Sequence, residues 1–444
     1  VDFSSPNIAK EMHVGHLRST IIGDTLCRTL EFCGHEVTRA NHVGDWGTQF
    51  GMLIQYLKEE YPDFLTQPPN ITDLTSFYKA AKMRFDESPE FKKIAQLNVV
   101  KLQSGDEQCR KIWHLLCEIS RVEFEKVYSR LQVKLVECGE SFYNPMIPGV
   151  IEELESKQLV KEDNGAKVIF LDHFKFPLIV RKSDGGYGYD STDMAAVQYR
   201  LKQLGCSWVV YVTDAGQAEH FYNVFDAAKA AGWCDEQEGG TRLHHVGFGV
   251  VQGEDGKKFK TRSGETVRLV DLLDEAVTRM RRSLEDRVKE GKCLLQPQEI
   301  AQAASALGYG AIKYFDLQQH PATAYVFSYD RMLDTRGNTA VYLLFAHARL
   351  ASILRKAAEE KGVDLGPLVD RALETLHLAH PSERALAFEI MQFGDVVEST
   401  VQELMPSRLC EYLYNLATKF TEFVTNCKVL DSPEMNSRLL LCEA

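Results

Sequence analysis

The chain has 444 residues, of which 44% are hydrophobic and 26% charged, so it is long enough for two or three domains with real cores. Its net charge of −12 argues against a surface that binds nucleic acid nonspecifically, although it allows a polynucleotide partner whose basic contacts are confined to a patch. The 11 cysteines are scattered and form no Cys-x-x-Cys pair, which favours reduced thiols in a cytosol over disulfides or a zinc site. The apolar runs are too short to span a bilayer.

Residues 1–50 predict the start of a βαβ unit. An N-terminal strand leads into a turn fixed by Pro6 and then into a helix over 16–33, where apolar residues recur at helical spacing and Gly34 ends the pattern. A second strand is predicted near 36–40. Parallel strands joined by helices indicate an α/β sheet that binds its ligands at the carboxyl ends of the strands.

Two histidines, His13 and His16, lie at the start of this helix with Gly15 between them. The unpaired N–H groups and the positive end of the helix dipole make such a position suited to phosphate. Gly15 would let a base or a ribose approach the backbone closely. Taken alone, the same three residues also fit a helix cap that carries two solvated histidines.

The stretch from about 52 to 165 is mostly helical in pattern, and its alternating Lys and Glu residues usually mark solvated helix faces. We interpret it as an insertion that splits the sheet. Strands are predicted again at 167–171, 176–181, 208–213 and 245–251.

A glycine-rich turn over 183–193 leads into a helix predicted over 194–204. Asp193 falls in its first turn, where the helix dipole stabilises a carboxylate. The alternative is that Asp190 and Ser191 simply cap the helix. Gln217 follows the next strand, where an ordinary buried turn is the alternative to a ligand contact, and His220 is expected to pack or cap.

Residues 253–264 combine glycines with lysines and Arg262. Mobile basic loops of this kind close on polyphosphate and place cations where charge builds up during nucleotidyl transfer. A lysine-rich hairpin turn is the alternative.

Beyond 270 the chain is predicted to be helical to its end, with helices over 267–290 and 298–315, a break at 321–329 and a bundle from 330 onward. Residues 330–356 carry five Lys or Arg against two Asp. Basic and aromatic residues on helices can hold phosphates and stack unpaired bases, whereas an ordinary bundle with a solvated face is the alternative.

The string from Ser4 to Lys10, followed by His13 to Ser19, resembles the HIGH signature of class I aminoacyl-tRNA synthetases and in particular that of arginyl-tRNA synthetase. A second block, from Asn41 to Gly51, is typical of the same family. Residues 258–262 resemble the KMSKS loop, with Thr261 in place of its second lysine. Many arginyl enzymes show this departure, and Lys10 is thought to supply the missing charge.

The resemblance covers most of the chain and implies its domains. They are an α/β Rossmann-like class I catalytic domain over 1–275, with a helical insertion over about 52–165 and the KMSKS-like loop at 253–264, then a helical connector over 276–329, and an all-α anticodon-binding helical bundle over 330–444. We expect the family's N-terminal region to be missing and the C-terminus to be truncated.

The implied function is that of an arginine–tRNA ligase of the cytoplasmic eukaryotic type. L-arginine and ATP would give arginyl-adenylate and pyrophosphate, and the arginyl group would pass to the 3′ end of tRNA(Arg), which must bind before the adenylate forms. Mg²⁺ would accompany ATP without a dedicated protein metal site. We expect no membrane partner, and a multi-synthetase complex could be joined through a missing upstream segment.

The site residues implied by the resemblance fall into four groups. The residues with a catalytic role are Lys10, His13, His16 and Lys258. The residues that bind arginine are Ser5, Asn7, His16, Tyr189, Asp193 and Gln217. The residues that bind ATP are His13, Gly15, His16, Lys258 and Lys260, and the candidate tRNA contacts are Tyr342, His347 and Arg349. The chemistry fits, because a carboxylate pairs bidentately with a guanidinium and an aromatic face can hold its plane.

Two other functions stay open. A cysteine- or pantoate-activating ligase of the same fold would explain the histidine turn and the lysine loop, but not the long helical domain after 330, and a cysteine site should carry a zinc cluster. A noncatalytic RNA-binding protein derived from a synthetase would explain the helical domain, but the loss of signature histidines that would support it is not seen.

Overall fold

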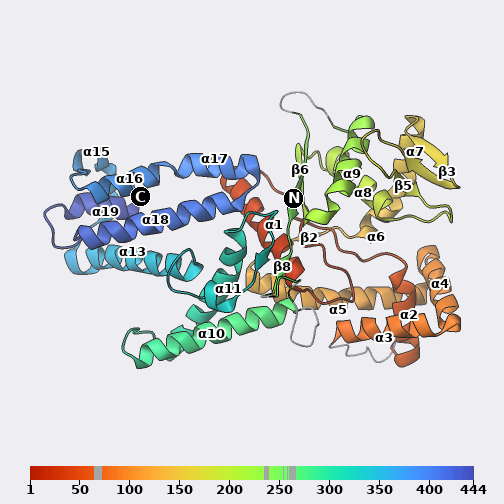
Figure 1. Cartoon of the computed structure of the whole chain (residues 1–444), viewed down its shortest axis with the longest axis horizontal. Helices are drawn as coiled ribbons and strands as arrows, with labels where there is room; N and C mark the ends of the chain where they lie inside the picture. The colour runs from red at the N-terminus through yellow and green to blue at the C-terminus, as the bar shows by residue number, and fades with distance from the viewer. Residues whose placement is uncertain (65–72, 235–239, 254, 258, 260–266) are drawn as a thin grey trace. The chain divides into compact units, whose positions relative to one another are not determined.

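The computed structural model describes residues 1–64, 73–234, 240–253, 255–257, 259 and 267–444 (Figure 1). The chain divides into two compact units. The first comprises Val1–Cys27, Glu36–Val251 and Phe259–Val270, and the second comprises Arg28–His35, Gln252–Lys258 and Asp271–Ala444.

A parallel sheet lies at the centre of the first unit. Strand β1 (Ala40–Asn41) pairs with β2 (Val136–Glu137), and β6 (Trp208–Asp214) pairs with β7 (Arg242–Phe248), both in parallel register. The predicted strand near 36–40 is therefore shorter than expected. Strand β2 lies within the range predicted as a helical insertion, where its two residues left no periodic signal.

The N-terminal segment joins these two pairs. Asp2 bridges Ala40 of β1 on one side and Tyr211 of β6 on the other, both in parallel. The order is therefore β2, β1, N-terminal segment, β6, β7, which is a doubly wound arrangement whose strand order reverses between the N-terminal segment and β6. Ligands of such sheets bind at that reversal, beyond the carboxyl ends of the strands.

Helix α1 (Val14–Phe32) begins directly after the turn that follows the N-terminal segment. Its residues up to Cys27 lie close against the segment, since a Cβ on Gly23 would stand 2.2 Å from the Phe3 ring. Ser19 donates from Oγ to the Val212 carbonyl at 2.7 Å and so ties the helix to β6.

The predicted helical insertion contains four long helices, namely α2 (Gln49–Glu60), α3 (Leu74–Glu87), α4 (Pro89–Ser104) and α5 (Glu107–Leu131). After β2 come α6 (Glu140–Tyr143), a 3-10 turn (Asn144–Met146) and α7 (Ile147–Ser156).

The strands β3 (Val160–Asp163), β4 (Ala166–Ile169) and β5 (Leu178–Arg181) form a separate antiparallel sheet. Helix α8 (Tyr189–Gln198) begins five residues earlier than predicted and continues as a π-helical turn (Tyr199–Gln203).

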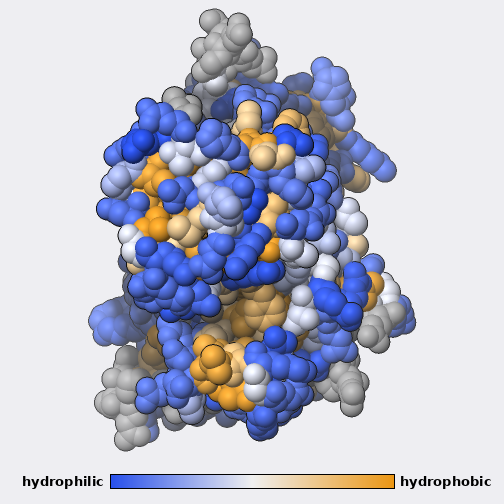
Figure 2. Space-filling view, turned by 90° about the vertical axis from the view of Figure 1, so that its left-hand side faces the viewer, coloured by the Kyte–Doolittle hydropathy of each residue, from blue (hydrophilic) through white to orange (hydrophobic). Residues whose placement is uncertain are grey.

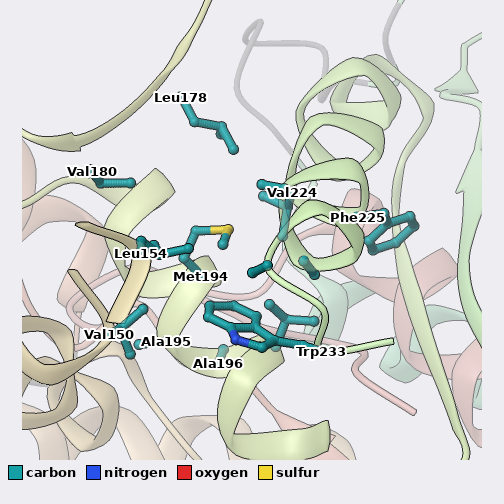
Figure 3. Packing of buried hydrophobic residues seen from close by; sticks show 14 of the residues in the cluster. Val150, Leu154, Leu178, Val180, Met194, Ala195, Ala196, Val224, Phe225 and Trp233 are labelled. Carbon is teal, nitrogen blue, oxygen red and sulfur yellow. The ribbon is translucent and has the colours of Figure 1, made fainter. Parts of the chain in front are cut away.

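One apolar core fixes α8 in place (Figure 3). Leu154 of α7, Met194 of α8, Val224 of α9 (Ala218–Ala230) and the nearby Trp233 point into the same space. Trp233 keeps its polar edge satisfied, because its indole Nε1–H donates to Glu153 at 2.8 Å. The side of α8 that faces away from this core can therefore carry polar residues in fixed positions.

The second unit is built mainly of helices. From Asp271 onward it holds the rest of α10 (Leu269–Lys289), then α11 (Pro297–Leu317), α12 (Tyr329–Met332), α13 (Ala340–Lys361), α14 (Leu365–Asp370), α15 (Ala372–Thr375), α16 (Pro381–Met391), α17 (Phe393–Glu403), α18 (Pro406–Asn426) and α19 (Met435–Glu443). Its bundle core gathers apolar residues of α13, α16, α18 and α19.

Figure 2 shows hydrophobic patches scattered among hydrophilic residues at the end of the molecule it faces.

Each helix in the described part of the chain is either too short or too polar to span a lipid bilayer.

Candidate active site

The turn after the N-terminal segment has an unusual backbone. Ser4, Ser5 and Ala9 have φ angles of 73°, 47° and 61°, in the left-handed region that non-glycine residues rarely adopt. Such residues persist when the surroundings hold them, and they cluster at functional sites. The holding contacts are N–H donations from Ser4 to Ser19 Oγ at 2.8 Å, from Ser5 to Asn41 Oδ1 at 3.0 Å, and from Ala9 to Ser120 Oγ at 2.9 Å.

The two histidines at the start of α1 hold each other's backbone. The Gly15 N–H donates to His13 Nδ1 at 3.0 Å, and the His13 N–H donates to His16 Nδ1 at 3.1 Å. The ring centroids are 4.1 Å apart. Because Nδ1 accepts a hydrogen bond in both rings, the proton of each neutral imidazole lies on Nε2, which is then a donor suited to phosphate oxygens.

The residues just before the histidines lie beside β1. Asn7 forms a parallel bridge with Gly44, where a Cβ would stand 2.2 Å from Asn7 Oδ1, so a larger residue there would displace the Asn7 side chain. Lys10 is exposed, and its Nζ lies 4.8 Å from the ring centre of Tyr78 on α3. Ser5 is half-buried and donates from Oγ to Asp2 Oδ1 at 3.1 Å.

The N-terminal part of α8 carries a network of carboxylates around one histidine. His220 of α9 is hydrogen-bonded through Nε2 to Asp193 Oδ2 at 2.6 Å, and its Nδ1 lies 3.3 Å from Asp190 Oδ1. Tyr189 is exposed, and its ring lies edge-on to His220 with centroids 4.9 Å apart. His220, expected only to pack or cap, thus orients the predicted arginine ligand Asp193.

This network keeps Asp193 ionised in spite of its burial. Burial alone would raise the pKa of Asp193, but the hydrogen bond with His220 and the charge of His42 outweigh it, so the pKa lies below its usual value. Burial would likewise lower the pKa of His220, whereas its bonds to Asp190 and Asp193 raise it to about 9. Asp193 is therefore an anionic, half-buried carboxylate close to the imidazole of His220.

Ser191 takes part in capping α8, as the alternative interpretation predicted, whereas Asp190 does not. The N-cap residue is Gly188, whose N–H donates to Ser191 Oγ at 3.2 Å, while Asp190 Oδ2 accepts from the Ile179 N–H at 2.8 Å. Gln217 is exposed in the 3-10 turn (Ala215–Gln217) that follows β6. It therefore lies, as predicted, beyond the carboxyl end of that strand.

Glu140, at the start of α6, was missed in the sequence. Burial, together with the charges of Asp45 and Asp193, raises its pKa to about 7. Glu140 follows β2 and so lies at the same carboxyl edge as the other site residues. Only recognition of the two-residue strand β2 could have pointed to it.

The remaining predicted residues are placed as follows. Lys258 and Lys260 lie outside the described residues. In the second unit, Tyr342 of α13 is half-buried, with its OH 3.3 Å from Thr421 Oγ1, whereas His347 and Arg349 are exposed on the same helix. No cluster of three His, Cys, Asp or Glu side chains in the described ranges is arranged to hold a metal ion.

A doubly wound parallel sheet, a helical insertion and a His-x-x-His turn at the central strand, followed by a helical bundle, define a class I aminoacyl-tRNA synthetase. Residues 1–329 match the family described as tRNA synthetases class I (R), catalytic domain, and residues 343–444 match the DALR anticodon binding domain.

Individual relatives agree with this class. An Arabidopsis thaliana protein named arginine–tRNA ligase, chloroplastic/mitochondrial, is 56% identical in an alignment that covers the whole of this chain and 68% of that protein. A second Arabidopsis thaliana protein, named arginine–tRNA ligase, cytoplasmic, is 54% identical over the whole of this chain and 74% of its own length. The crystal structure of arginyl-tRNA synthetase from Plasmodium falciparum superposes with a TM-score of 0.87 at 43% identity, over 99% of this chain and 72% of that one. The chain belongs to the arginyl-tRNA synthetase family, the class I arginine–tRNA ligases.

The pKa of Glu140 leads to a prediction about stability. Because this pKa is about 7 in the folded chain against an ordinary value of 4.5, the folded state keeps a proton that the unfolded chain loses between these pH values. Stability therefore falls as pH rises from 4.5 to about 7 and stays lower above it. We expect Glu140→Gln to unfold like the wild type at pH 5 but to be more stable at pH 8, by at most about 3 kcal/mol.

Urea unfolding at pH 5 and pH 8 measures this difference. The control is Glu152→Gln, which alters an exposed glutamate of α7 and should change the midpoint at neither pH. A Glu140→Gln variant that is less stable than the wild type at pH 8 would contradict the raised pKa.

Proposed function

We propose that this arginine–tRNA ligase binds the guanidinium group of L-arginine between Asp193 and Glu140, with Tyr189 against it. The observation that carries the proposal is a pair of half-buried carboxylates that interact with each other, of which Glu140 is costly to ionise without a cation nearby. A guanidinium is always charged and presents its N–H donors in a planar fork, so it can satisfy both carboxylates at once.

The other end of arginine is assigned to the neighbouring strands. Ser5 and Asn7 follow the N-terminal segment, and Gln217 follows β6, so all three lie where the strand order reverses. Their hydroxyl and amide groups can donate to the carboxylate of arginine or accept from its ammonium group. This places the reacting carboxylate toward the start of α1.

ATP is assigned to the start of α1. Gly15 lets the nucleotide approach the backbone, and the Nε2–H groups of His13 and His16 donate to phosphate oxygens. Lys10, together with Lys258 and Lys260 of the KMSKS-like stretch, neutralises the phosphates, and Mg²⁺ bound with ATP would supply further positive charge.

The first reaction step is then an in-line displacement. A carboxylate oxygen of arginine forms a bond to the α-phosphorus of ATP while the bond to the bridging oxygen breaks, and pyrophosphate leaves with that electron pair. The protein contributes alignment of the two substrates and positive charge around the phosphates, since no covalent protein intermediate is needed.

In the second step a hydroxyl of the terminal ribose of tRNA(Arg) bonds to the carbonyl carbon of arginyl-adenylate, the bond from that carbon to the phosphate oxygen breaks, and AMP leaves with the electron pair. We assign the anticodon end of that RNA to the α13 region of the second unit, where the exposed side chains of His347 and Arg349 can meet phosphates or bases. Tyr342 is half-buried and packs against Tyr414, with ring centroids 5.8 Å apart, so its first role is in the bundle.

The enzyme is proposed to act in the cytosol. None of the 11 cysteines, all within the described ranges, forms a disulfide, which supports a reducing compartment. The named relatives include one cytoplasmic and one organellar protein, so the compartment needs a direct test. Fractionation of cells that express the tagged full-length protein should find it in the soluble cytosol. Recovery with chloroplasts or mitochondria would overturn this assignment. The eukaryotic-type assignment and association with other synthetases stay predictions.

The function is tested by ATP–pyrophosphate exchange with each of a panel of amino acids, with and without tRNA(Arg). We expect exchange with arginine alone and only in the presence of the tRNA. Exchange with another amino acid would contradict the guanidinium pocket. Exchange with arginine in the absence of tRNA would contradict only the requirement for tRNA and would leave the pocket assignment unchanged.

The pocket assignment predicts that Asp193→Ala raises the KM for arginine on the order of 100-fold, because a charge-assisted bidentate pair is lost, and leaves the KM for ATP within about twofold. Steady-state aminoacylation measures both constants. Asp163→Ala, which removes an exposed aspartate of β3, should change neither. Similar increases for arginine and ATP in the Asp193 variant would rule out a guanidinium ligand.

A further inference from the structure

Arg200 is a buried cation that none of the assigned roles uses. It lies in the π-helical turn that continues α8, and only 4% of its surface is exposed. An unpaired guanidinium at such depth would be strongly disfavoured, so its partners must be specific. Short π-helical turns inside helices often occur at functional sites.

The partner of Arg200 is Asp2 of the central N-terminal segment. Arg200 Nη2 lies 2.7 Å from Asp2 Oδ2, and both side chains are almost wholly buried. The guanidinium carbon lies 5.8 Å from the ring centre of Tyr143 and 5.0 Å from that of Tyr211, and Nη2 also donates to Tyr143 OH at 3.4 Å. Within the described part of the chain, Nε and Nη1 have no hydrogen-bond partner, so Asp2 and the two rings fix the guanidinium.

Asp2 in turn holds one wall of the proposed arginine pocket. Its Oδ1 accepts from Ser5 Oγ at 3.1 Å, and its Oδ2 lies 3.9 Å from His42 Nδ1. Ser5 has a left-handed backbone that depends on outside contacts. The other wall, with Tyr189 and Asp193, lies on α8, the helix that leads into Arg200.

We propose that Arg200 is a positioning residue for arginine, which joins the two walls of the pocket by fixing Asp2, and through it Ser5, relative to α8. This inference rests on the proposed arginine pocket. The ion pair spans the place where the strand order reverses, between the N-terminal segment and the elements around β6. Loss of the pair would let the Ser5 wall shift against the Asp193 wall, and misplacement of about 1 Å is enough to cost on the order of 100-fold in rate.

The test compares Arg200→Met and Arg200→Lys with the wild type by steady-state aminoacylation. Methionine keeps the bulk but removes the charge, whereas lysine keeps the charge but loses the planar fork and its packing between the two tyrosines. We expect the KM for arginine to rise at least about tenfold in Arg200→Met, with a smaller rise in Arg200→Lys, and the KM for ATP to stay within about twofold in both.

Arg242→Met is the matched control. It removes an exposed arginine that stacks on Trp208, with the guanidinium carbon 3.7 Å from the ring centre, at the amino ends of β6 and β7. This variant should keep both KM values. A double variant with Asp2→Asn should show little further rise in the KM for arginine beyond that of either single variant, since both act through one ion pair.

The outcomes separate the possible roles. A lower melting temperature with an unchanged KM for arginine, or equal rises for arginine and ATP, would overturn the positioning role and leave Arg200 as a structural residue. If Arg200→Met does not fold, Arg200→Lys is compared with the wild type instead, and a rise in its KM for arginine without a matching rise for ATP supports the positioning role. Failure of the proposed arginine pocket would be distinct, because Asp193→Ala would then leave the KM for arginine unchanged or raise the KM values for arginine and ATP alike.

Discussion

The site depends on the position of the N-terminal segment in the middle of the parallel sheet. The Asp2 N–H donates to the Val210 carbonyl at 2.8 Å, the Val212 N–H donates to the Asp2 carbonyl at 2.9 Å, and the Phe3 N–H donates to the Ala40 carbonyl at 3.1 Å. A segment held from both sides can end in a strained turn without relaxing. This explains why consecutive left-handed serines occur directly after it, and why α1 begins at the reversal of strand order.

Three carboxyl groups near this turn have surroundings that affect their ionisation differently. Asp2 is paired with Arg200, Asp193 is hydrogen-bonded to His220, and Glu140 remains a carboxylate whose ionisation is opposed by burial and by its acidic neighbours. A cationic ligand would favour the ionised form of Glu140 most, because the groups that raise its pKa are carboxylates and no cation is among them. In the proposed function, arginine binding lowers the free-energy cost of ionising Glu140, as is common where function and stability compete.

Local sequence predicts the nucleotide side of the site better than the amino acid side. The helix start at His13 and His16 and the αL-type end at Gly34 follow from spacing and backbone preference within a few residues, and the α/β class and the helical bundle are confirmed. In contrast, the role of His220 depends on α9 packing beside α8, and Glu140 depends on a strand of two residues. Such short strands are set by their pairing partners, so propensity and periodicity do not reveal them.

The two sides also differ in what holds them. At the start of α1, backbone N–H groups fix the imidazoles through Nδ1, so this part of the site needs little beyond the turn itself. The proposed amino acid side is made of charges from distant segments: Asp2 is paired with Arg200, and burial together with the charges of Asp45 and Asp193 raises the pKa of Glu140. Removing one charged side chain changes the free energy of ionisation of its neighbours, because charges interact strongly at low dielectric. In the proposed function, recognition of arginine therefore depends on several assembled segments, whereas phosphate binding needs only one helix terminus.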